Sequence, residues 1–457
     1  MRTLAIIVAK LLVLIGRLAG KGSVTPGAVA LRICPTLAKR LVLPPIKIAV
    51  TGSSGKGSTS TFIADSLRAL GYSVVHNSAG SNMRNGIITM LLRSSSLSGR
   101  IKADALVAEV DERSCKHVFD FLEPDMVVIT NITRDQPPRQ RHTDFIFEEI
   151  YKALSGKEHL ILNGDDPLLM RFSLVDGTEP GSTAADITTY GLTADCGFKS
   201  SSPRFDAVDA AYCPLCASRL EYRYHLFESQ GAYRCPEGHY DHHLDMAVNM
   251  IERGVAEDGS EDVLVVDNAV RLQANSRLHF NVCNVMAAYT TLSQLSLPHD
   301  EQRIATALSQ QTVSKKIFNY YQWQGRRVYV LNNKAENATT FNQSVLFTAE
   351  LAEPVVLVVG WMEISRRYDS DDLAWLYDVN FDLLANQVTA AVCTGIDAET
   401  IAVRLKYAGI PEERISVSSG MDARVAEAIG RTEGPIVAIL NFDHVQPFID
   451  LTDDKAR

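Results

Sequence analysis

A glycine-rich segment at residues 51–59, Thr-Gly-Ser-Ser-Gly-Lys-Gly-Ser-Thr, constrains the fold more than any other feature of the chain. A short β-branched run at residues 46–50 precedes it, and a helix-compatible stretch follows it. Between a strand and a helix, the N–H groups of such a loop, the helix N-terminus and a lysine together surround nucleotide phosphates. The pattern predicts a nucleotide-binding α/β unit; the alternative is a glycine and serine turn in which Lys56 is incidental.

Residues 51–59, which we call the phosphate loop, depart from the usual Walker pattern. Only two residues separate Gly52 from Gly55, and Gly57 stands where a Mg²⁺-binding Ser or Thr normally follows the lysine. Ser58 or Thr59, or a hydroxyl from another segment, must then serve the metal. The residues predicted to contact the nucleotide phosphates are Thr51, Gly52, Ser53, Ser54, Gly55, Lys56, Gly57, Ser58 and Thr59.

A carboxylate at the end of a strand is the expected second partner of Mg²⁺, because a metal that bridges phosphates needs hard oxygen ligands. Glu109 lies near the end of the apolar run at residues 105–110 and is our choice. Asp111 and Glu112 compete with it if the register is shifted, and a solvated acid without a metal is the remaining alternative.

Apolar runs of strand length alternate with helix-compatible segments along most of the chain. They cover residues 46–50, 72–75, 105–110, 126–129, 159–162, 327–331, 354–359, 389–394, 414–417 and 435–440. Such alternation is typical of a parallel sheet covered by helices on both faces. We predict an α/β protein with a leader at residues 1–44, a central nucleotide-binding domain at 45–314 and a second, Rossmann-like α/β domain at 315–457.

Charge and cysteine usage narrow the class of protein. The net charge of −9 argues against a nucleic-acid partner, since a surface that follows phosphates is usually basic. The composition, 46% hydrophobic and 22% charged, is that of an ordinary soluble globular protein. Single cysteines inside apolar runs, such as Cys283 and Cys393, favour a reducing compartment. We therefore expect a cytoplasmic protein.

The N-terminal segment at residues 4–18 is strongly apolar, as a signal peptide would be. Lys10 and Arg17 interrupt it, it is too short to span a bilayer, and no small-residue cleavage site follows. It predicts an amphipathic helix that packs on the protein or touches a membrane surface.

Cysteines cluster once, in an aromatic-rich insert at about residues 205–245. Cys213 and Cys216 form a Cys-x-x-Cys pair, and Cys235 follows after 18 residues. Thiolates at this spacing bind one tetrahedral Zn²⁺, and a zinc ribbon closes with a second pair. Gly238 stands where the last cysteine would lie, so three reduced thiols without metal are the alternative. His239 is the simplest fourth ligand, and the other candidates are His242 and His243.

Several motifs together resemble the MurT family of Mur ligases over nearly the whole chain. They occur in the order and context of that family, and the zinc insert is a feature that separates MurT from ordinary Mur ligases. Besides the phosphate loop, they lie at residues 77–82, 108–112, 130–136, 163–167, 280–288, 341–343 and 372–381.

The resemblance implies a Mur ligase central domain with an inserted zinc ribbon, followed by a MurT-type C-terminal domain. It implies an ATP-dependent ligase in which Mg²⁺, held by Ser81 and Glu109, and Lys56 act on the phosphates. Asn281 and Asn284, three apart on a helix, would hold the adenine and ribose, with helix capping as the alternative role for Asn281. The structural Zn²⁺ would take no part in the chemistry.

For the reaction, the resemblance implies that the D-glutamate α-carboxylate of lipid II is amidated through an acyl phosphate. Ammonia would come from a GatD-like glutaminase in a heterodimer, and a peripheral membrane contact through the substrate is consistent with this. Asp372 would complete the glutaminase triad, with Asp378 second and a helix-surface acid as the alternative. The rival functions are a stand-alone carboxylate–amine ligase of the folylpolyglutamate type and a non-catalytic nucleotide-binding subunit.

Two segments depart from the MurT pattern. The family has Lys-Asn-Pro-Ala-Gly before Phe341, whereas this chain has Glu-Asn-Ala-Thr-Thr at residues 336–340. Pro137 and Pro138 replace the expected Leu-Asp. The chain is thus expected to be a divergent member, and the departures weaken the substrate expectation more than the fold expectation.

Overall fold

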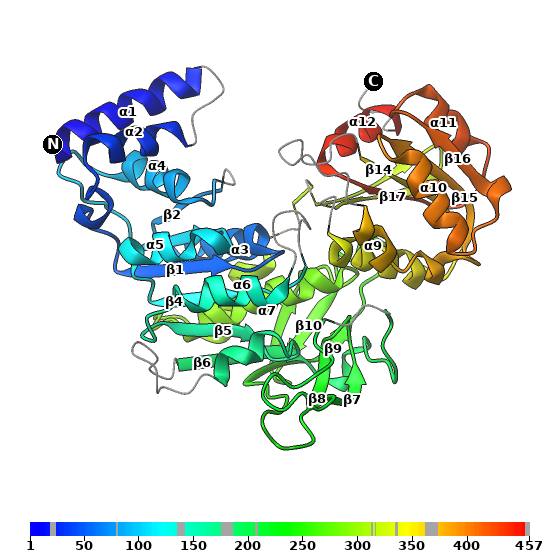
Figure 1. Ribbon diagram of the computed structural model, residues 1–457, viewed down its shortest axis with the longest axis horizontal. Helices are drawn as coiled ribbons and strands as arrows, with labels where there is room; N and C mark the ends of the chain where they lie inside the picture. The colour runs from blue at the N-terminus through cyan, green and yellow to red at the C-terminus, as the bar shows by residue number, and fades with distance from the viewer. Residues whose placement is uncertain are drawn as a thin grey trace.

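Two large sheets organise the computed structural model of the chain (Figure 1). The structure describes residues 1–18, 24–78, 81–134, 142–174, 186–205, 209–311, 314–315, 317–333, 337–361 and 373–452. In Figure 1 the C-terminal sheet lies at the upper right, and the first sheet occupies the centre and left.

The first sheet has nine strands, in the order β11 (Val270–Gln273), β10 (Val263–Val266), β9 (Met246–Glu252), β6 (Asp186–Leu192), β5 (His159–Asn163), β4 (Met126–Ile129), β1 (Ile46–Thr51), β3 (Ala105–Glu109) and β2 (Val74–His76). The strands from β9 to β2 pair in parallel, whereas β10 and β11 form an antiparallel edge. Strand β1 is buried on both faces because its neighbours carry helices on each side.

Helices cover both faces of this sheet. One face packs against α3 (Lys56–Ala69), α7 (His279–Gln294) and α8 (Glu301–Ser309). The other face packs against α4 (Arg84–Ser94), α5 (Cys115–Leu122) and α6 (Thr143–Tyr151). Two N-terminal helices, α1 (Arg2–Leu18) and α2 (Thr25–Ile33), extend this second layer beyond α4 (Figure 1). None of the described helices is both long and apolar enough to cross a membrane.

The second sheet has six strands, in the order β12 (Phe318–Trp323), β13 (Arg326–Asn332), β17 (Ile436–Leu440), β14 (Val355–Trp361), β15 (Val388–Gly395) and β16 (Ile415–Ser418). Successive side chains of β14 point to opposite cores. Val355 and Leu357 meet α9 (Ala338–Glu350) and α10 (Ala398–Tyr407), while Val356 and Val358 meet α11 (Ala423–Gly430) and α12 (Phe442–Thr452). Each face of the second sheet therefore has its own helical layer.

The insert between β6 and β9 carries a two-stranded sheet of β7 (Glu221–His225) and β8 (Gly231–Arg234). Buried side chains fasten it to the first sheet. The Tyr233 hydroxyl donates to the Gly164 carbonyl oxygen at 3.2 Å, and His242 Nε2 lies 2.8 Å from Oδ1 of the fully buried Asp165. The insert is thus held against the carboxyl ends of β5 and β6.

The predicted α/β architecture with parallel sheets is confirmed, with two corrections. The strands β10, β11 and β12 pair antiparallel, so neither sheet is wholly parallel. The strands β6, β9, β10, β11 and β12 were not among the predicted runs. Polar positions interrupt the apolar pattern in all of them except β10, which is apolar throughout. The expected N-terminal helix is present as α1.

Gly27 tests the packing of α2 on α4. Its N–H donates to Thr89 Oγ1 at 2.9 Å, and a Cβ at this position would lie 2.2 Å from the Asn85 carbonyl oxygen. Overpacking at a close contact costs about 1–3 kcal/mol. We expect Gly27→Ala to lower the free energy of unfolding by that amount in urea titrations. Gly430→Ala is the control, because a Cβ there would meet nothing within 4 Å; equal stability of the two variants would contradict the packing argument.

Candidate functional site

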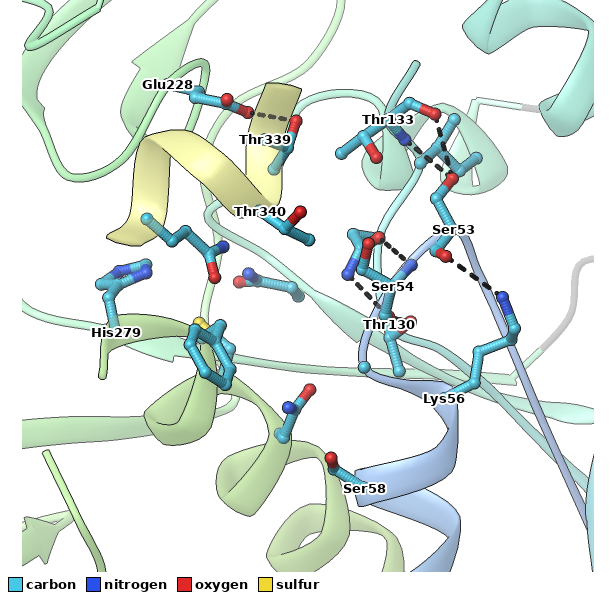
Figure 2. A pocket seen from close by; sticks show the side chains of 18 of the residues that line it. Ser53, Ser54, Lys56, Ser58, Thr130, Thr133, Glu228, His279, Thr339 and Thr340 are labelled. Carbon is cyan, nitrogen blue, oxygen red and sulfur yellow. Dashed lines mark hydrogen bonds between the residues drawn. The ribbon is translucent and has the colours of Figure 1, made fainter. Parts of the chain in front are cut away.

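A cavity of about 370 Å³ lies where the phosphate loop, the start of α7 and the start of α9 meet (Figure 2). The loop contributes residues 53–58, the first sheet contributes Glu109 and residues 130–133, and the second half of the chain contributes Thr339, Thr340 and Gln343. This volume lies in the range of small-molecule sites. Most of the phosphate loop is therefore brought to one site with segments far away in sequence.

Two glycines allow the phosphate loop to be enclosed. Gly52 and Gly55 have φ values of +124° and +78°, which residues with side chains rarely adopt. A Cβ on Gly52 would lie 2.4 Å from Thr130 Oγ1, and one on Gly55 would lie 2.3 Å from Asn284 Oδ1. Gly55 caps α3, whose first turn lines the cavity and presents N–H groups that have no partner within the helix. This arrangement fits phosphate groups.

Lys56 is held in place by an ion pair that the sequence reasoning did not foresee. Its Nζ lies 2.6 Å from Glu112 Oε1 and also donates to the carbonyl oxygens of Gly52 and Ser53. The Lys56 and Glu112 side chains are 12% and 3% exposed. Pairing is required for both, since an isolated buried charge is costly. Glu112 is thus the partner of the lysine.

Glu109 is the one of the three candidate carboxylates that lines the cavity. It ends β3, which pairs with β1 so that Glu109 lies beside Val50. Asn82 Nδ2 donates to Glu109 Oε1 at 2.9 Å, and a Cβ on Gly57 would lie 3.4 Å from Oε2. The carboxylate of Glu109 therefore lies close to the first turn of α3, where a side chain at position 57 would touch it.

The hydroxyl groups that are candidate magnesium ligands also differ in whether they reach the cavity. Ser58 lines the cavity, whereas Thr59 is fully buried and its Oγ1 donates to Asn284 Oδ1 at 3.3 Å. Asn82 lines the cavity, but the adjacent Ser81 does not, and its carbonyl oxygen accepts from Asn77. The turn before α4 therefore directs Asn82 inward, and the role of Ser81 as a magnesium ligand stays a prediction.

The two asparagines of α7 do not share one environment. Asn284 lines the cavity beside Gly55. Asn281 lies outside the lining, 2% exposed, and its Nδ2 donates to the Asn275 carbonyl oxygen at 2.9 Å. The loop before α7 thus engages one donor of the Asn281 amide, and its contact with the adenine or ribose stays a prediction. Asn281 braces the start of α7, whose N-cap is Leu278.

His279 and Glu228 line the cavity and were missed by the sequence reasoning. His279 is 5% exposed, and neither ring nitrogen has a hydrogen-bond partner among the described residues. Burial lowers the pKa of His279 to about 4, so its ring is neutral near pH 7. His279 begins α7, Glu228 lies in a turn, and neither belongs to a sequence motif, so no sequence pattern indicated that the fold would bring them to the cavity.

Glu228 comes from the turn between β7 and β8, with φ of +49°. Its Oε2 accepts from Thr339 Oγ1 at 3.2 Å, which joins the insert to α9 (Figure 2). Exclusion of water around the carboxyl, and then the charge of Asp209, raise the pKa of Glu228 to about 8. The side chain thus holds a proton at neutral pH.

Asp372 lies outside the described residues, whereas Asp378 ends a short 3-10 helix, Ala374–Asp378. Asp378 Oδ2 lies 2.8 Å from Arg134 Nη1, and Arg134 Nε lies 2.8 Å from Asp209 Oδ1. Arg134 therefore links the C-terminal segment to the insert. Glu336, the charge-reversed position, is also outside the described residues.

Four side chains of the insert form a compact cluster away from the cavity. The potential ligand atoms of Cys213, Cys216, Cys235 and His239 all lie within 4.8 Å of one another. His239 Nδ1 lies 3.7 Å from Cys213 Sγ and 3.5 Å from Cys235 Sγ. The other two candidate histidines are engaged with Asp165 and Asp245. The donor set of three sulfurs and one nitrogen suits a tetrahedral metal.

Comparison with known proteins gives agreeing results for both halves of the chain. The model of the Mur ligase middle domain matches residues 50–195, and that of the MurT ligase C-terminal region matches residues 335–442. The MurT subunit of Lipid II isoglutaminyl synthase (glutamine-hydrolyzing) from Staphylococcus aureus is 28% identical, over 98% of this chain and 96% of its own. The subunit of the same name from Streptococcus pneumoniae is 24% identical, over 88% and 86%.

The fold is shared with solved ligases. A pseudomurein peptide ligase type C from Methanothermus fervidus superposes with a TM-score of 0.65 at 16% identity, over 91% of this chain and 80% of that one. With the two family models matched in order and relatives aligned over nearly its whole length, the chain is similar to MurT-type Mur ligases from its first sheet to its C-terminal domain.

Proposed function

We propose that the chain is the ligase subunit of a lipid II isoglutaminyl synthase. As a Mur ligase family protein it is an ATP-dependent ligase. The relatives that match nearly its whole length carry the isoglutaminyl synthase name. The cavity carries the proposal, because the phosphate loop, Glu109 and the start of α9 meet there. The proposal includes a cytoplasmic location and domains at residues 1–44, 45–314 and 315–457.

ATP and Mg²⁺ fit the residues that line the cavity. The first turn of α3 would hold the phosphates, and Asn284 and His279 lie where they can contact the rest of the nucleotide. Glu109 and Ser58 offer the hard oxygen atoms that Mg²⁺ prefers. The metal would supply charge neutralisation at the transferred phosphoryl group. Lys56 adds a fixed positive charge, kept in position by Glu112.

The reaction in this cavity is amide formation on the D-glutamate α-carboxylate of lipid II. The carboxylate oxygen attacks the γ-phosphorus, the bond to the bridging oxygen breaks and ADP leaves. Ammonia then attacks the acyl carbon of the acyl phosphate, phosphate leaves, and the nitrogen loses one proton. Glu228 supports the last step, because a carboxyl with a pKa of about 8 exchanges protons close to neutral pH.

Ammonia would come from a GatD-like glutaminase that forms a heterodimer with this chain. Asp372 stays our first candidate for the residue that serves the glutaminase triad. Asp378, the second candidate, already pairs with Arg134. The stand-alone ligase is the rival, and it requires activity on an amine substrate with no glutaminase present.

The cysteine cluster is proposed to hold structural Zn²⁺ through Cys213, Cys216, Cys235 and His239. A closed four-ligand site leaves no position for water or substrate. Its task is to keep β7 and β8 folded, so that the turn between them presents Glu228 to the cavity.

Lys56 provides the direct test of the ligase function. We expect Lys56→Met to lower ammonia-dependent ADP release with lipid II by at least about a hundredfold, or about 2.7 kcal/mol of barrier. Because that variant leaves Glu112 buried without its partner, Lys56→Met/Glu112→Gln is measured beside it and should be folded and equally inactive. Lys47→Met, which removes a partly buried lysine of β1 that does not line the cavity, is the control. Wild-type rates in the double variant would refute the assigned role, and ADP release driven only by a different amine would favour the rival ligase.

The zinc site is tested by metal analysis. We expect about one zinc per chain in wild-type protein and loss of most of it in Cys213→Ser and His239→Ala, with a lower melting temperature. His243→Ala is the matched control, because His243 lies on the surface against Asp245. Stoichiometric zinc in both ligand variants would count against the site.

The raised pKa of the Glu228 carboxyl predicts that the stability of the protein depends on pH. The unfolded carboxyl ionises near pH 4.5, whereas the folded one keeps its proton to about pH 8. In that window the folded state binds more protons, so this group makes stability fall as pH rises. Glu228→Gln should gain about 1–2 kcal/mol on wild type between pH 5 and pH 8 in urea unfolding, after discount for solvent screening.

The same variant should slow amide formation by about two orders of magnitude if Glu228 exchanges the proton. Glu221→Gln, an exposed change on β7, should alter neither the free energy of unfolding nor the rate of amide formation. A stability difference that does not vary with pH would show that Glu228 is ionised in the folded protein.

A further inference from the structure

Helix α1 has apolar side chains on two opposite faces. Ala5, Ile6 and Ala9 are fully buried in the core that α2 and α4 share. The spacing of 100° per residue places a second apolar group on the far side of the helix. We call it the outer stripe, and its members, with their exposed fractions, are Leu4 (52%), Ile7 (39%), Leu11 (54%), Leu14 (57%) and Ile15 (60%).

An outward apolar face is opposite to what a surface helix normally shows. Helices that pack on a protein with one face carry polar residues on the other. Five large aliphatic side chains on adjacent turns form a contiguous patch, and such patches mark interaction sites. In Figure 1, α1 lies at the outer edge of the molecule, beside α2.

The charge of residues 1–103, which we call the basic lobe, indicates what kind of partner the outer stripe would contact. Residues 1–103 contain 14 of the 45 Lys and Arg side chains but one of the 54 acidic ones, Asp65. The rest of the chain is therefore strongly acidic. Helix α1 contains no acidic residue, and Lys10 Nζ donates to the Arg93 carbonyl oxygen at 3.3 Å. Further exposed cations of the lobe are Arg32, Arg40, Arg93, Arg100 and Lys102.

A turn of the basic lobe packs against the inner, buried face of α1. A Cβ on Gly99 would lie 3.7 Å from Ile6 Cδ1 and 3.6 Å from the Arg40 carbonyl oxygen. The turn that carries Arg100 therefore sits against the first turns of α1, beside Arg40. An exposed apolar face, on a helix that packs against a segment rich in cations and is too short to cross a bilayer, matches an interfacial helix.

We propose that the outer stripe of α1 docks this protein on the surface of an anionic lipid bilayer. The apolar side chains enter the interface, and the basic lobe is held by the lipid headgroups. The charge favours this occupant over a second copy of the chain, because two basic lobes would repel each other. The inference rests on the proposed function in one respect: an enzyme whose acceptor is lipid-linked works at such a surface.

Vesicle co-sedimentation of the full chain tests the docking. We expect binding to vesicles of phosphatidylglycerol and phosphatidylcholine at low salt, and little binding to phosphatidylcholine alone or at high salt. Leu11→Gln/Leu14→Gln should lower the partition coefficient by at least about tenfold, because both apolar insertion and charge are needed. The matched control is Val403→Gln/Tyr407→Gln, which changes two exposed side chains on α10 (51% and 78%). Circular dichroism and melting curves establish that both variants are folded.

Equal binding of wild type and the stripe variant would overturn the proposal, as would failure of wild type to bind anionic vesicles. Light scattering without vesicles adds a third outcome. If the wild type is a dimer and the stripe variant is a monomer, the outer stripe is an interface between two copies of the chain, and the docking proposal is refuted. The vesicles contain neither lipid II nor ATP, so this result stands apart from the proposed function, which ADP release with detergent-dispersed lipid II tests separately.

Discussion

The close approach of the phosphate loop to its neighbours is the constraint on which the site depends. Two positions in the loop accept no side chain, because Thr130 and Asn284 occupy the space where a Cβ of Gly52 or Gly55 would lie. This contact joins β1, β4 and α7 at one point. The Lys56–Glu112 ion pair then secures the loop from the other side, since neither charge can be buried without the other.

Around this loop, the cavity is completed by segments that belong to different parts of the fold. Asn337, the N-cap of α9, donates to Ser54 Oγ at 3.4 Å, and Thr339 donates to Glu228 of the insert. Arg134 adds an ion-paired link between Asp209 and Asp378. The insert thus acts as a third wall, and a metal that keeps it folded would influence the cavity without touching a substrate.

Much of the architecture could be predicted from the chain alone, and the exceptions have physical causes. The strands β1, β4 and β5 lie where the apolar pattern places them, within one residue. The edge strands β11 and β12 escaped detection because polar side chains interrupt their apolar pattern. In the site, Glu109 and Ser58 reach the cavity as expected, whereas Asn281 turns to Asn275 because a side-chain amide bonds whichever backbone group lies closest.

The sequence by itself determined the phosphate loop, the two α/β units and the spacing of the zinc ligands, because each depends on local periodicity or on glycine and cysteine positions a few residues apart. The tertiary structure alone decided which carboxylate pairs with Lys56 and which histidine joins the cysteines. It also decided that Glu228 faces α9 and that α1 keeps an apolar face outward. These outcomes depend on contacts between residues as far as 111 positions apart, which local patterns do not encode.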